Sequence, residues 1–415
     1  MRGHSLKKKE LPEGDFGVAG AHTARRSNPR VLQVHHFRFP AVAGGVDRVV
    51  VELLRALGPH EAVLFEVGGW SDRRLVKKHV EGFTVYRRRL RRPSSKASWH
   101  QKVWAVLEEV LTLAQLALLL RRERIDVVHL HTLQDYQEYF IRLSRWGLCR
   151  CLLTLHRGET LGFRERSRQQ QERWRRILDR CWGVSAVSRS LARLAERRLP
   201  MRKRVRAVLN GIGDPAEATG MVGAEFQGES GYALCIGALE HYKGHDIAIE
   251  AWRNVGRQYP ELELRIVGSG SLERSLRRQA EESHARVRFM GALRHEEVLE
   301  TLAGASLFLM PSRNEGLGVA VLEAMSLSRP IIASDIPVFQ ELITDGDDGR
   351  LFEAGNAESL SRTVMEVLSD DQSRARLQTS ARARFLKRFR AAEMVAGYRQ
   401  IYREIRSGAA SDAGG

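Results

Sequence analysis

The sequence predicts an α/β protein with two Rossmann-like domains that face each other across a cleft. The chain has 415 residues, too many for one ordinary hydrophobic core but a good fit to two domains of common size. Short β-rich runs alternate with helical patterns in two blocks, an order typical of mostly parallel sheets covered by helices on both faces. A glycine-rich stretch between the blocks, 211–231, predicts a linker.

The first block starts at Arg30 and alternates strands with helices. In it, six apolar residues between the first two strands recur at the helical spacing and predict one buried stripe: Val46, Val49, Val50, Leu53, Leu54 and Leu57. The expected strands are 31–37, 62–67, 83–87, 125–130, 151–155, 183–187 and 205–209. Further helices are expected at 102–122, 136–146, 166–180 and 188–199.

The second block repeats the alternation after the linker. Its expected strands are 232–236, 263–267, 287–290, 306–310 and 330–333, and its helices 244–258, 271–283, 295–303, 317–327 and 357–368. The predicted organisation is a disordered tail (1–28), an N-terminal domain (29–212), a linker (213–231), a C-terminal domain (232–385) and a C-terminal helix (386–407).

Composition favours a cytosolic protein. No apolar run follows the lysines near the N-terminus, so we expect no secretory signal there. The apolar-rich stretch 103–120 contains two glutamates and a glutamine, and we interpret it as too polar and slightly too short for a membrane span. The four cysteines lack paired zinc-ligand spacing and are expected to be small buried or half-buried residues.

Charge is distributed unevenly. Residues 1–210 hold 43 Lys/Arg and 20 Asp/Glu, whereas the remainder holds 24 basic and 30 acidic residues. Eleven Lys/Arg between Arg73 and Lys102, with Trp99 and Trp104 nearby, favour an anionic membrane surface as a partner, although an arginine-rich run such as 87–92 is more often a solvated surface. Nucleic-acid binding is the alternative that charge alone allows, but no recognised nucleic-acid motif accompanies it.

Candidate site residues of the first block follow its strands, because ligands of open parallel sheets bind beyond the carboxyl ends of the strands. Gly44 and Gly45 open the first helix, where backbone can approach a ligand and free N–H groups can hold an anion. His131 and His156 close consecutive strands, where each can hydrogen-bond a sugar hydroxyl. The alternatives are a tight turn for the glycines and structural roles for the histidines.

The second block offers a more specific set. Lys243 stands just before a helix, where a compact positive charge can neutralise a diphosphate. Glu315, Gly316, Leu317 and Gly318 run into a helix that bears Glu323, and the glycines free N–H groups for a phosphate. The two glutamates would be about 12 Å apart along a helix axis, close to the separation of hexose and ribose in a nucleotide sugar. A solvent-facing lysine and a chance pair of glutamates are the alternatives.

These residues resemble a known family. The stretch from Tyr232 to Phe352 resembles the family 4 glycosyltransferases of the GT-B class in four features: Gly-x-Leu-x-x-x-Lys-Gly at 237–244, Gly-Ser-Gly at 268–270, Pro-Ser followed by Glu-x7-Glu at 311–323, and Pro330 opening a strand. The N-terminal block fits through Gly44-Gly45, His131, His156 and Asn210-Gly211, so that the resemblance spans residues 30 to 400.

The resemblance implies a role for each matching position. The N-terminal domain would bind the acceptor, and the C-terminal domain a nucleotide-diphosphate sugar as co-substrate. His156 and Glu315 would act at the reacting sugar; Gly45, Lys243, Gly316, Leu317, Gly318 and Glu323 would bind the donor; Gly44 and His131 would lie on the acceptor side. Family members retain the anomeric configuration and need no metal or other cofactor.

Two positions depart from the family pattern. Ala238 stands where an arginine is usual, and Arg313 or His241 is expected to replace that phosphate-binding cation. Ser328 replaces a glycine two residues before Pro330, which alters only a turn. The pair Asp345 and Asp347 looks like a metal-binding Asp-x-Asp, but it lies in a glycine-containing turn, and we interpret it as turn chemistry.

The expected function is therefore retaining transfer of a hexose-type sugar from a nucleotide-diphosphate donor to a glycan or lipid-linked acceptor, in surface polysaccharide or glycoconjugate synthesis. The expected location is the cytoplasm, with peripheral attachment to the inner face of the membrane, and nucleic acid is not an expected partner. An epimerase-like enzyme that acts on the nucleotide sugar without transfer is an alternative.

Overall fold

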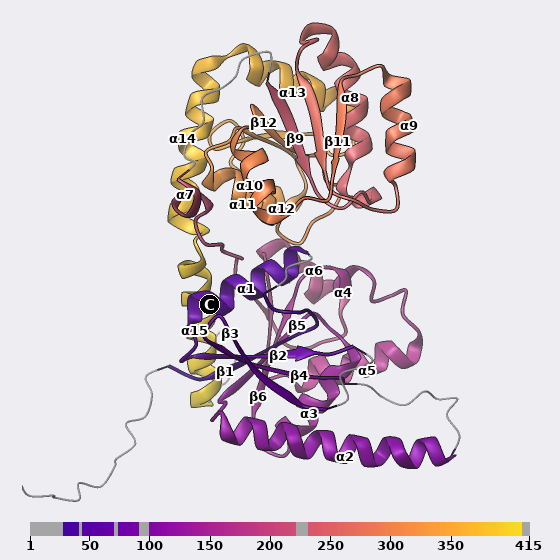
Figure 1. The fold of residues 1–415 in the computed structure, drawn as a ribbon, viewed down its shortest axis with the longest axis vertical. Helices are drawn as coiled ribbons and strands as arrows, with labels where there is room; N and C mark the ends of the chain where they lie inside the picture. Colours follow the sequence, from indigo (N-terminus) through magenta and orange to yellow (C-terminus); the bar gives the residue numbers. More distant parts are fainter. Residues whose placement is uncertain (1–27, 41–43, 70–73, 91–98, 221–230, 409–415) are drawn as a thin grey trace, which may run out of the picture.

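The computed structural model describes residues 28–40, 44–69, 74–90, 99–220 and 231–408. Two α/β domains, each built on one sheet, are stacked along the long axis of the molecule (Figure 1). This arrangement confirms the predicted fold class. The predicted disordered tail lies outside the described residues except for Asn28.

The N-terminal sheet has eight strands in the order β3-β4-β2-β1-β5-β6-β7-β8. All neighbours pair in parallel except β3 and β4, which form an antiparallel edge. The strands are β1 (Val31–His35), β2 (Ala62–Val67), β3 (Val76–Val80), β4 (Phe83–Arg88), β5 (Val127–His131), β6 (Arg150–Leu155), β7 (Gly183–Ala186) and β8 (Val205–Ala207).

Helices cover both faces of this sheet, and its central strands are buried on both sides. Every residue of β1, β2 and β5 is buried. On one face, Val31 and Leu64 pack with α1 (Gly45–Leu57) and with α15 (Ala391–Ser407). On the other face, Leu32 and Phe65 share a core with α2 (Trp99–Arg122). The domain is completed by α3 (Glu138–Arg145), α4 (Gly158–Leu161), α5 (Arg168–Arg180) and α6 (Arg189–Arg198).

The C-terminal sheet has six parallel strands in the order β11-β10-β9-β12-β13-β14. They are β9 (Tyr232–Ile236), β10 (Glu263–Val267), β11 (Val287–Gly291), β12 (Leu307–Met310), β13 (Ile331–Ser334) and β14 (Arg350–Phe352). Its helices are α8 (His245–Gln258), α9 (Glu273–Ser283), α10 (His295–Ala303), α11 (Val319–Ser326), α12 (Pro337–Leu342), α13 (Ala357–Ser369) and α14 (Asp371–Arg388).

The strands β3 and β14 were not predicted from the sequence, for different reasons. The edge strand β3 reads Val-Lys-Lys-His-Val and is largely exposed, so it has no apolar face from which to predict it. The strand β14 has only three residues. All four cysteines are buried and free, as expected.

The predicted C-terminal helix 386–407 is present as α15 but begins later, at Ala391. Helix α14 belongs to the C-terminal domain and continues to Arg388, and a break at Phe389 and Arg390 precedes α15. Helix α15 crosses back to the N-terminal domain and packs beside α1 (Figure 1). The N-terminal domain is therefore completed by the last helix of the chain.

The structure describes part of the linker predicted at 213–231. It contains the short helix α7 (Pro215–Thr219), while residues 221–230 lie outside the described part of the chain. The buried Asp214 caps α7 and accepts two hydrogen bonds of 2.6 Å from the guanidinium of Arg382 on α14. These hydrogen bonds outweigh the effect of burial and lower the pKa of the Asp214 carboxyl. The first part of the linker is thus tied to the C-terminal domain.

Candidate active site

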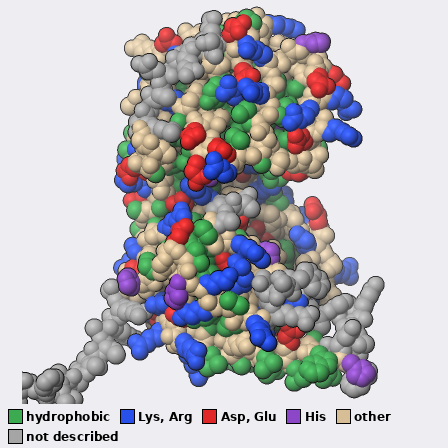
Figure 2. Space-filling model, viewed as in Figure 1, with side chains coloured by type: hydrophobic (Ala, Val, Ile, Leu, Met, Phe, Trp, Pro, Cys, Tyr) green, Lys and Arg blue, Asp and Glu red, His purple; other side chains and the backbone are tan. Residues whose placement is uncertain are grey.

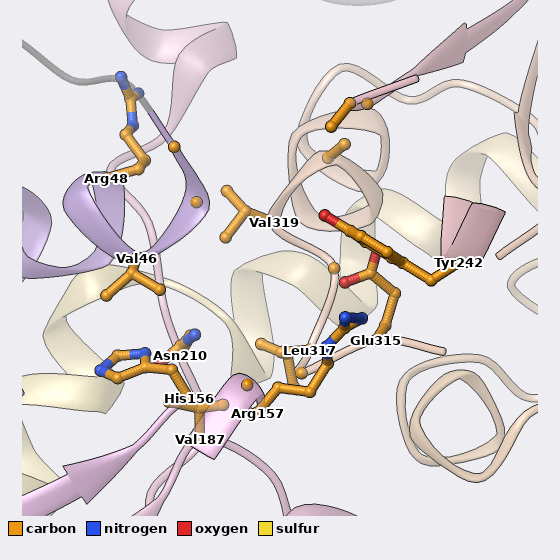
Figure 3. Close-up of a pocket in the computed structure, with 18 of the residues that line it drawn as sticks. Val46, Arg48, His156, Arg157, Val187, Asn210, Tyr242, Glu315, Leu317 and Val319 are labelled. Atoms are coloured by element: carbon orange, nitrogen blue, oxygen red, sulfur yellow. The ribbon is translucent and has the colours of Figure 1, made fainter. Parts of the chain in front are cut away.

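A cavity of about 770 Å³ lies between the two domains. In Figure 3, Val46, Arg48 and His156 face Glu315 and Val319 across it, so that each domain supplies one wall. The cavity brings together all but one of the site residues predicted from sequence: Gly44, Gly45, His156, Lys243, Glu315, Gly316, Leu317, Gly318 and Glu323. The exception is His131, which lies behind His156.

Three contacts hold the facing loops together. A Cβ atom at Gly316 would lie 2.3 Å from the carbonyl oxygen of His156, so only glycine allows this approach of the two backbones. The hydroxyl of Ser188 donates to the carbonyl of Gly316 at 3.0 Å, and the guanidinium of Arg157 donates to the carbonyl of Asn314, also at 3.0 Å. The loops after β6 and β7 therefore dock directly on the loop after β12.

Lys243 and Glu315 form an ion pair on the side of the cavity that the C-terminal domain supplies. Both side chains are mostly buried, and the hydroxyl of Ser312 also donates to Glu315 at 3.4 Å. The next residue, Gly244, has a φ of +69°, and a Cβ atom there would collide with the carbonyl of Pro311. This turn fixes where Lys243 leaves the backbone, and its ammonium group reaches Glu315 at the cavity.

The helix that carries Glu323 begins later than expected. Gly318 is its N-cap, with a φ of +88°, and α11 starts at Val319. Glu315 therefore precedes the helix, and the predicted separation of about 12 Å along one helix axis does not apply. The first two residues of α11, Val319 and Ala320, line the cavity, and the N–H of Val321 donates to the carbonyl of Gly318 at 3.0 Å. The N-terminus of a helix favours an anion.

Glu323 is a buried carboxyl at the cavity wall. Burial raises its pKa to about 7, the nearby Glu52 adds to the rise, and the positive charge of Arg48 opposes it. The imidazole of His295 lies 3.8 Å from this carboxyl. Near neutral pH, Glu323 can therefore both accept and donate hydrogen bonds to a hydroxyl-bearing ligand.

A chain of buried polar groups supports His156 from behind. The hydroxyl of Tyr402 on α15 lies 2.7 Å from Nδ1 of His129 and accepts from the amide of Gln33 at 3.2 Å. The other end of Gln33 lies 2.8 Å from Nε2 of His131, whose Nδ1 lies 3.3 Å from Nε2 of His156. The last helix of the chain is thus connected to the cavity through four side chains.

These hydrogen bonds assign the tautomers of His131 and His156. Because Oε1 of Gln33 can only accept, Nε2 of His131 carries the proton and its Nδ1 accepts from Nε2–H of His156. Burial lowers the pKa of His156 to about 3, helped by the charge of His35, and holds the pKa of His131 well below its usual range. Both rings are neutral, and Nδ1 of His156 remains a hydrogen-bond acceptor.

Several cavity residues were missed from sequence. They are Arg48, Arg157, Asn210, Tyr242 and His295. Of these, only Asn210 enters the sequence analysis, as part of the pair Asn210-Gly211. The guanidinium of Arg157 stacks 4.1 Å from the ring centre of Tyr242. The side-chain oxygen of Asn210 is buried and has no hydrogen-bond partner among the described residues, which points to a ligand. Arg48 stands three residues after Gly45, so the helical period could have placed it at the site.

The expected replacements for the missing arginine are wrong. Arg313 makes two hydrogen bonds to Asp246, of 2.7 and 2.6 Å, and lines a different cavity. His241 is exposed and is not among the residues that line the large cavity. Arg48 does line the large cavity, on the side opposite the C-terminal wall (Figure 3). Glu52, on the same helix, pairs with its guanidinium at 3.0 Å. The second cation of this site therefore comes from the N-terminal domain.

Within the described residues, no group of three His, Cys, Asp or Glu is arranged to hold a metal ion. Asp345 accepts a hydrogen bond from the backbone N–H of Leu351 at 2.8 Å and pairs with Arg350 at 3.4 Å. Neither Asp345 nor Asp347 lines the cavity. The Asp-x-Asp sequence thus stabilises a turn outside the site.

Both halves of the chain match family models. Residues 43–214 match the model described as Glycosyltransferase Family 4, and residues 222–384 match that of Glycosyl transferases group 1. The chain is 27% identical to an uncharacterized glycosyltransferase of Methanocaldococcus jannaschii over 43% of this chain and 50% of that protein. It is 35% identical to a GDP-mannose-dependent monoacylated α-(1-6)-phosphatidylinositol monomannoside mannosyltransferase of Corynebacterium glutamicum over 36% of this chain and 41% of that protein. These matches span half or less of each relative's length.

Solved structures share the fold over nearly the whole chain. A sucrose-phosphate synthase from Thermosynechococcus elongatus has a TM-score of 0.72 at 19% identity, covering 92% of this chain and 100% of that one. The Anabaena protein HepE in complex with UDP and glucose has a TM-score of 0.68 at 16% identity, covering 90% and 99%. At these identities the likeness establishes the two-domain GT-B fold.

We expect Tyr402→Phe to disturb the histidine chain. It leaves the buried amide of Gln33 and Nδ1 of His129 without their partner, and the free energy of unfolding should fall by about 1–3 kcal/mol in urea titrations. Because Gln33 fixes the proton on His131, the ¹⁵N chemical shifts of His131 and His156 should change as well. Unchanged shifts at both histidines would contradict the tautomer assignment.

Tyr398→Phe is the matched control on the same helix. The hydroxyl of Tyr398 lies 3.2 Å from Thr154 and does not touch Gln33. Thr154 keeps its contacts with Ser185 and His129 in this variant. Its free energy of unfolding can fall, but the ¹⁵N shifts of His156 should remain as in the wild type.

Proposed function

This chain belongs to the family 4 glycosyltransferases, and we propose that it transfers a hexose-type sugar, with retention of anomeric configuration, from a nucleotide-diphosphate donor to a glycan or lipid-linked acceptor. The observation that carries the proposal is the cavity itself. It combines one lysine, three arginines, a helix N-terminus and three carboxyls within one space between the domains. That set suits a ligand with two phosphates between hydroxyl-rich ends.

The proposed donor pose follows from charge. The diphosphate lies at the N-terminus of α11 and draws Lys243 away from Glu315, while Arg48 contributes the second positive charge from the opposite wall. Glu315, released from part of its ion pair, accepts from sugar hydroxyls. Glu323, deeper along α11, binds the ribose hydroxyls. When the sugar leaves, the negative charge that develops on the phosphate meets donors already in place.

The proposed acceptor side is the N-terminal wall. Gly44 and Gly45 border it, and His156 presents the unprotonated Nδ1 to a sugar hydroxyl, with His131 supporting from behind. The Corynebacterium relative is named for GDP-mannose-dependent transfer to a phosphatidylinositol monomannoside, which supports a lipid-linked acceptor and makes GDP-mannose the first donor to test. Such an acceptor would bring the enzyme from the cytoplasm to the inner face of a membrane.

The donor pose predicts the effect of two substitutions. A screen of GDP-mannose, UDP-glucose and ADP-glucose first identifies the active donor. With that donor, Lys243→Ala and Glu315→Gln should each lower kcat/KM by about tenfold or more. Each loses a charge-assisted contact worth about 1.5–3 kcal/mol. The exposed Lys78 and Glu282 provide matched controls, Lys78→Ala and Glu282→Gln, which should retain wild-type rates. Near-normal rates in both site variants would refute the donor pose.

The raised pKa of Glu323 predicts a pH dependence of donor binding. The folded-state pKa is about 7, so the carboxylate form is lost as the pH falls through 7 toward 6. If ribose hydroxyls donate to the carboxylate, donor affinity measured by calorimetry should fall by about three- to tenfold per pH unit in that window. The Glu323→Gln variant should bind the donor more weakly at pH 8, and its donor affinity should no longer depend on pH in this window. This loss distinguishes titration of Glu323 from titration of the donor phosphates, which the substitution does not change. A variant with the wild-type pH profile would exclude Glu323 from the ribose site.

We propose further that transfer needs no metal ion, because Lys243, Arg48 and the N-terminus of α11 supply the positive charge for the leaving diphosphate. Activity should persist in excess EDTA at more than about half its initial rate, since each of these groups can stabilise phosphate charge directly. Loss of transfer in EDTA that magnesium or manganese restores would reject this part of the proposal.

A further inference from the structure

Helix α2 exposes an apolar face to solvent. The residues Val103, Leu107, Val110, Leu111 and Leu118 recur at spacings of three, four and seven and form one stripe. Each of their side chains is at least 49% exposed, and Trp104 and Val106, beside the stripe, are 72% and 58% exposed. These seven are most of the exposed large hydrophobic residues in the described part of the chain. In Figure 2, hydrophobic side chains gather along the lower edge, where α2 lies in Figure 1.

The opposite face of α2 belongs to the core of the N-terminal domain. Leu113, Leu116, Leu119 and Leu120 are buried in the same cluster as Leu32 and Phe65 of the sheet. The helix is therefore apolar on both sides, although only one side has a partner in the protein. By length and composition, Val103–Arg122 could span a membrane, so the sequence-based exclusion was wrong on that criterion.

Arginines fasten α2 to the domain. The guanidinium of Arg88 donates to Thr112 at 2.7 Å and to Gln115 at 2.8 Å, and Arg89 pairs with Glu108 at 3.2 Å. A third tie joins Arg142 of α3 to Glu109. A membrane-spanning α2 would have to break these contacts and empty the core behind it, so the helix stays on the protein surface.

The arginine run expected to face lipid does not do so where the structure describes it. Arg88 is buried, Arg87 pairs with the buried Glu66, and Arg89 is held by Glu108. Arg73, Arg91, Arg92 and Lys96 lie outside the described residues, as do the side chains of Trp99 and Lys102. These three arginines therefore do not face lipid, whereas Arg74 and Lys78 of the basic cluster predicted between Arg73 and Lys102 are exposed.

We propose that the outer face of α2 docks the protein on an anionic lipid bilayer, with the helix lying in the plane of the interface. An amphipathic arrangement of this kind inserts apolar side chains between head groups while the polar surroundings remain in water. The stripe carries no charged side chain from Val103 to Leu118, and Arg121 and Arg122 follow at its end, exposed, where phosphates of lipid head groups would lie.

Charge favours lipid over a second copy of this chain. Residues 1–210 carry 43 basic and 20 acidic side chains, so two copies meeting through α2 would bring two strongly basic halves together. An anionic surface complements the same charge. The position of α2 at the end of the molecule, far from the C-terminal domain, lets the whole stripe meet a plane without obstruction from that domain (Figure 1).

The test is flotation of the full-length protein with vesicles of phosphatidylcholine, with and without 30% phosphatidylglycerol, at about 0.1 and 0.5 M salt. The wild type should float with the anionic vesicles, and part of this binding should survive high salt because apolar insertion is not screened. Trp104→Ser, Leu107→Ser and Leu111→Ser combined should lower the bound fraction by about tenfold or more.

Matched single substitutions serve as controls. Leu111→Ser should weaken flotation severalfold, whereas Leu386→Ser, at an exposed leucine of α14, should leave it unchanged. Because the replaced side chains are exposed, unfolding midpoints should stay at the wild-type value. Flotation of the triple variant at the wild-type level would overturn the proposal, and so would a wild type that forms α2-dependent dimers in sedimentation without floating. No donor is present in this assay, so its outcome is independent of the proposed transfer.

Discussion

The architecture of the site depends on one backbone contact between the domains. At Gly316 the loop after β12 comes so close to the carbonyl of His156 that no side chain could be accommodated. Ser188 and Arg157 add hydrogen bonds to the same loop from the other domain. Because this loop leads directly into α11, its position also sets where the helix N-terminus points. A displacement here would move the N-terminus of α11 and Glu315 together relative to the N-terminal wall.

The second organising feature is the return of α15 to the N-terminal domain. Its two tyrosines are buried; the hydroxyl of Tyr402 lies 2.7 Å from His129, and that of Tyr398 lies 3.2 Å from Thr154, which also contacts His129. In that environment imidazolium is strongly disfavoured, so the histidines act as neutral donors and acceptors whose directions are fixed by one another. The buried histidine at the cavity therefore stays neutral in the neutral pH range, whereas burial raises the pKa of Glu323 to about 7.

The sequence predicted the fold and most of the cavity lining because both depend on local patterns. Strand–helix alternation implies parallel sheets, and parallel sheets put their ligands beyond strand ends, where the glycines, His156 and Lys243 were found. What failed depends on tertiary contacts. The ion pair of Arg313 with Asp246, the burial of Arg88 under α2 and the break before α15 leave no periodic signal. Helix α2 was predicted at 102–122, but its exposed apolar face was not. Its apolar residues lie on two opposite faces and produce no clear amphipathic period.

The distance between α2 and the cavity has a consequence for the choice of acceptor. In Figure 1 the N-terminal sheet lies between them, so a bilayer that touched α2 would be separated from the reaction by at least a helix layer and a sheet layer, about 20 Å. A sugar attached directly to a lipid head group, as in the acceptor named for the Corynebacterium relative, would not reach the cavity from a bilayer held at α2, whereas the tip of an extended glycan could, so the acceptor of this chain would be longer than that relative's. The N-terminal domain would then act as a molecular ruler, and chain length rather than terminal sugar alone would decide which lipid-borne glycans are elongated.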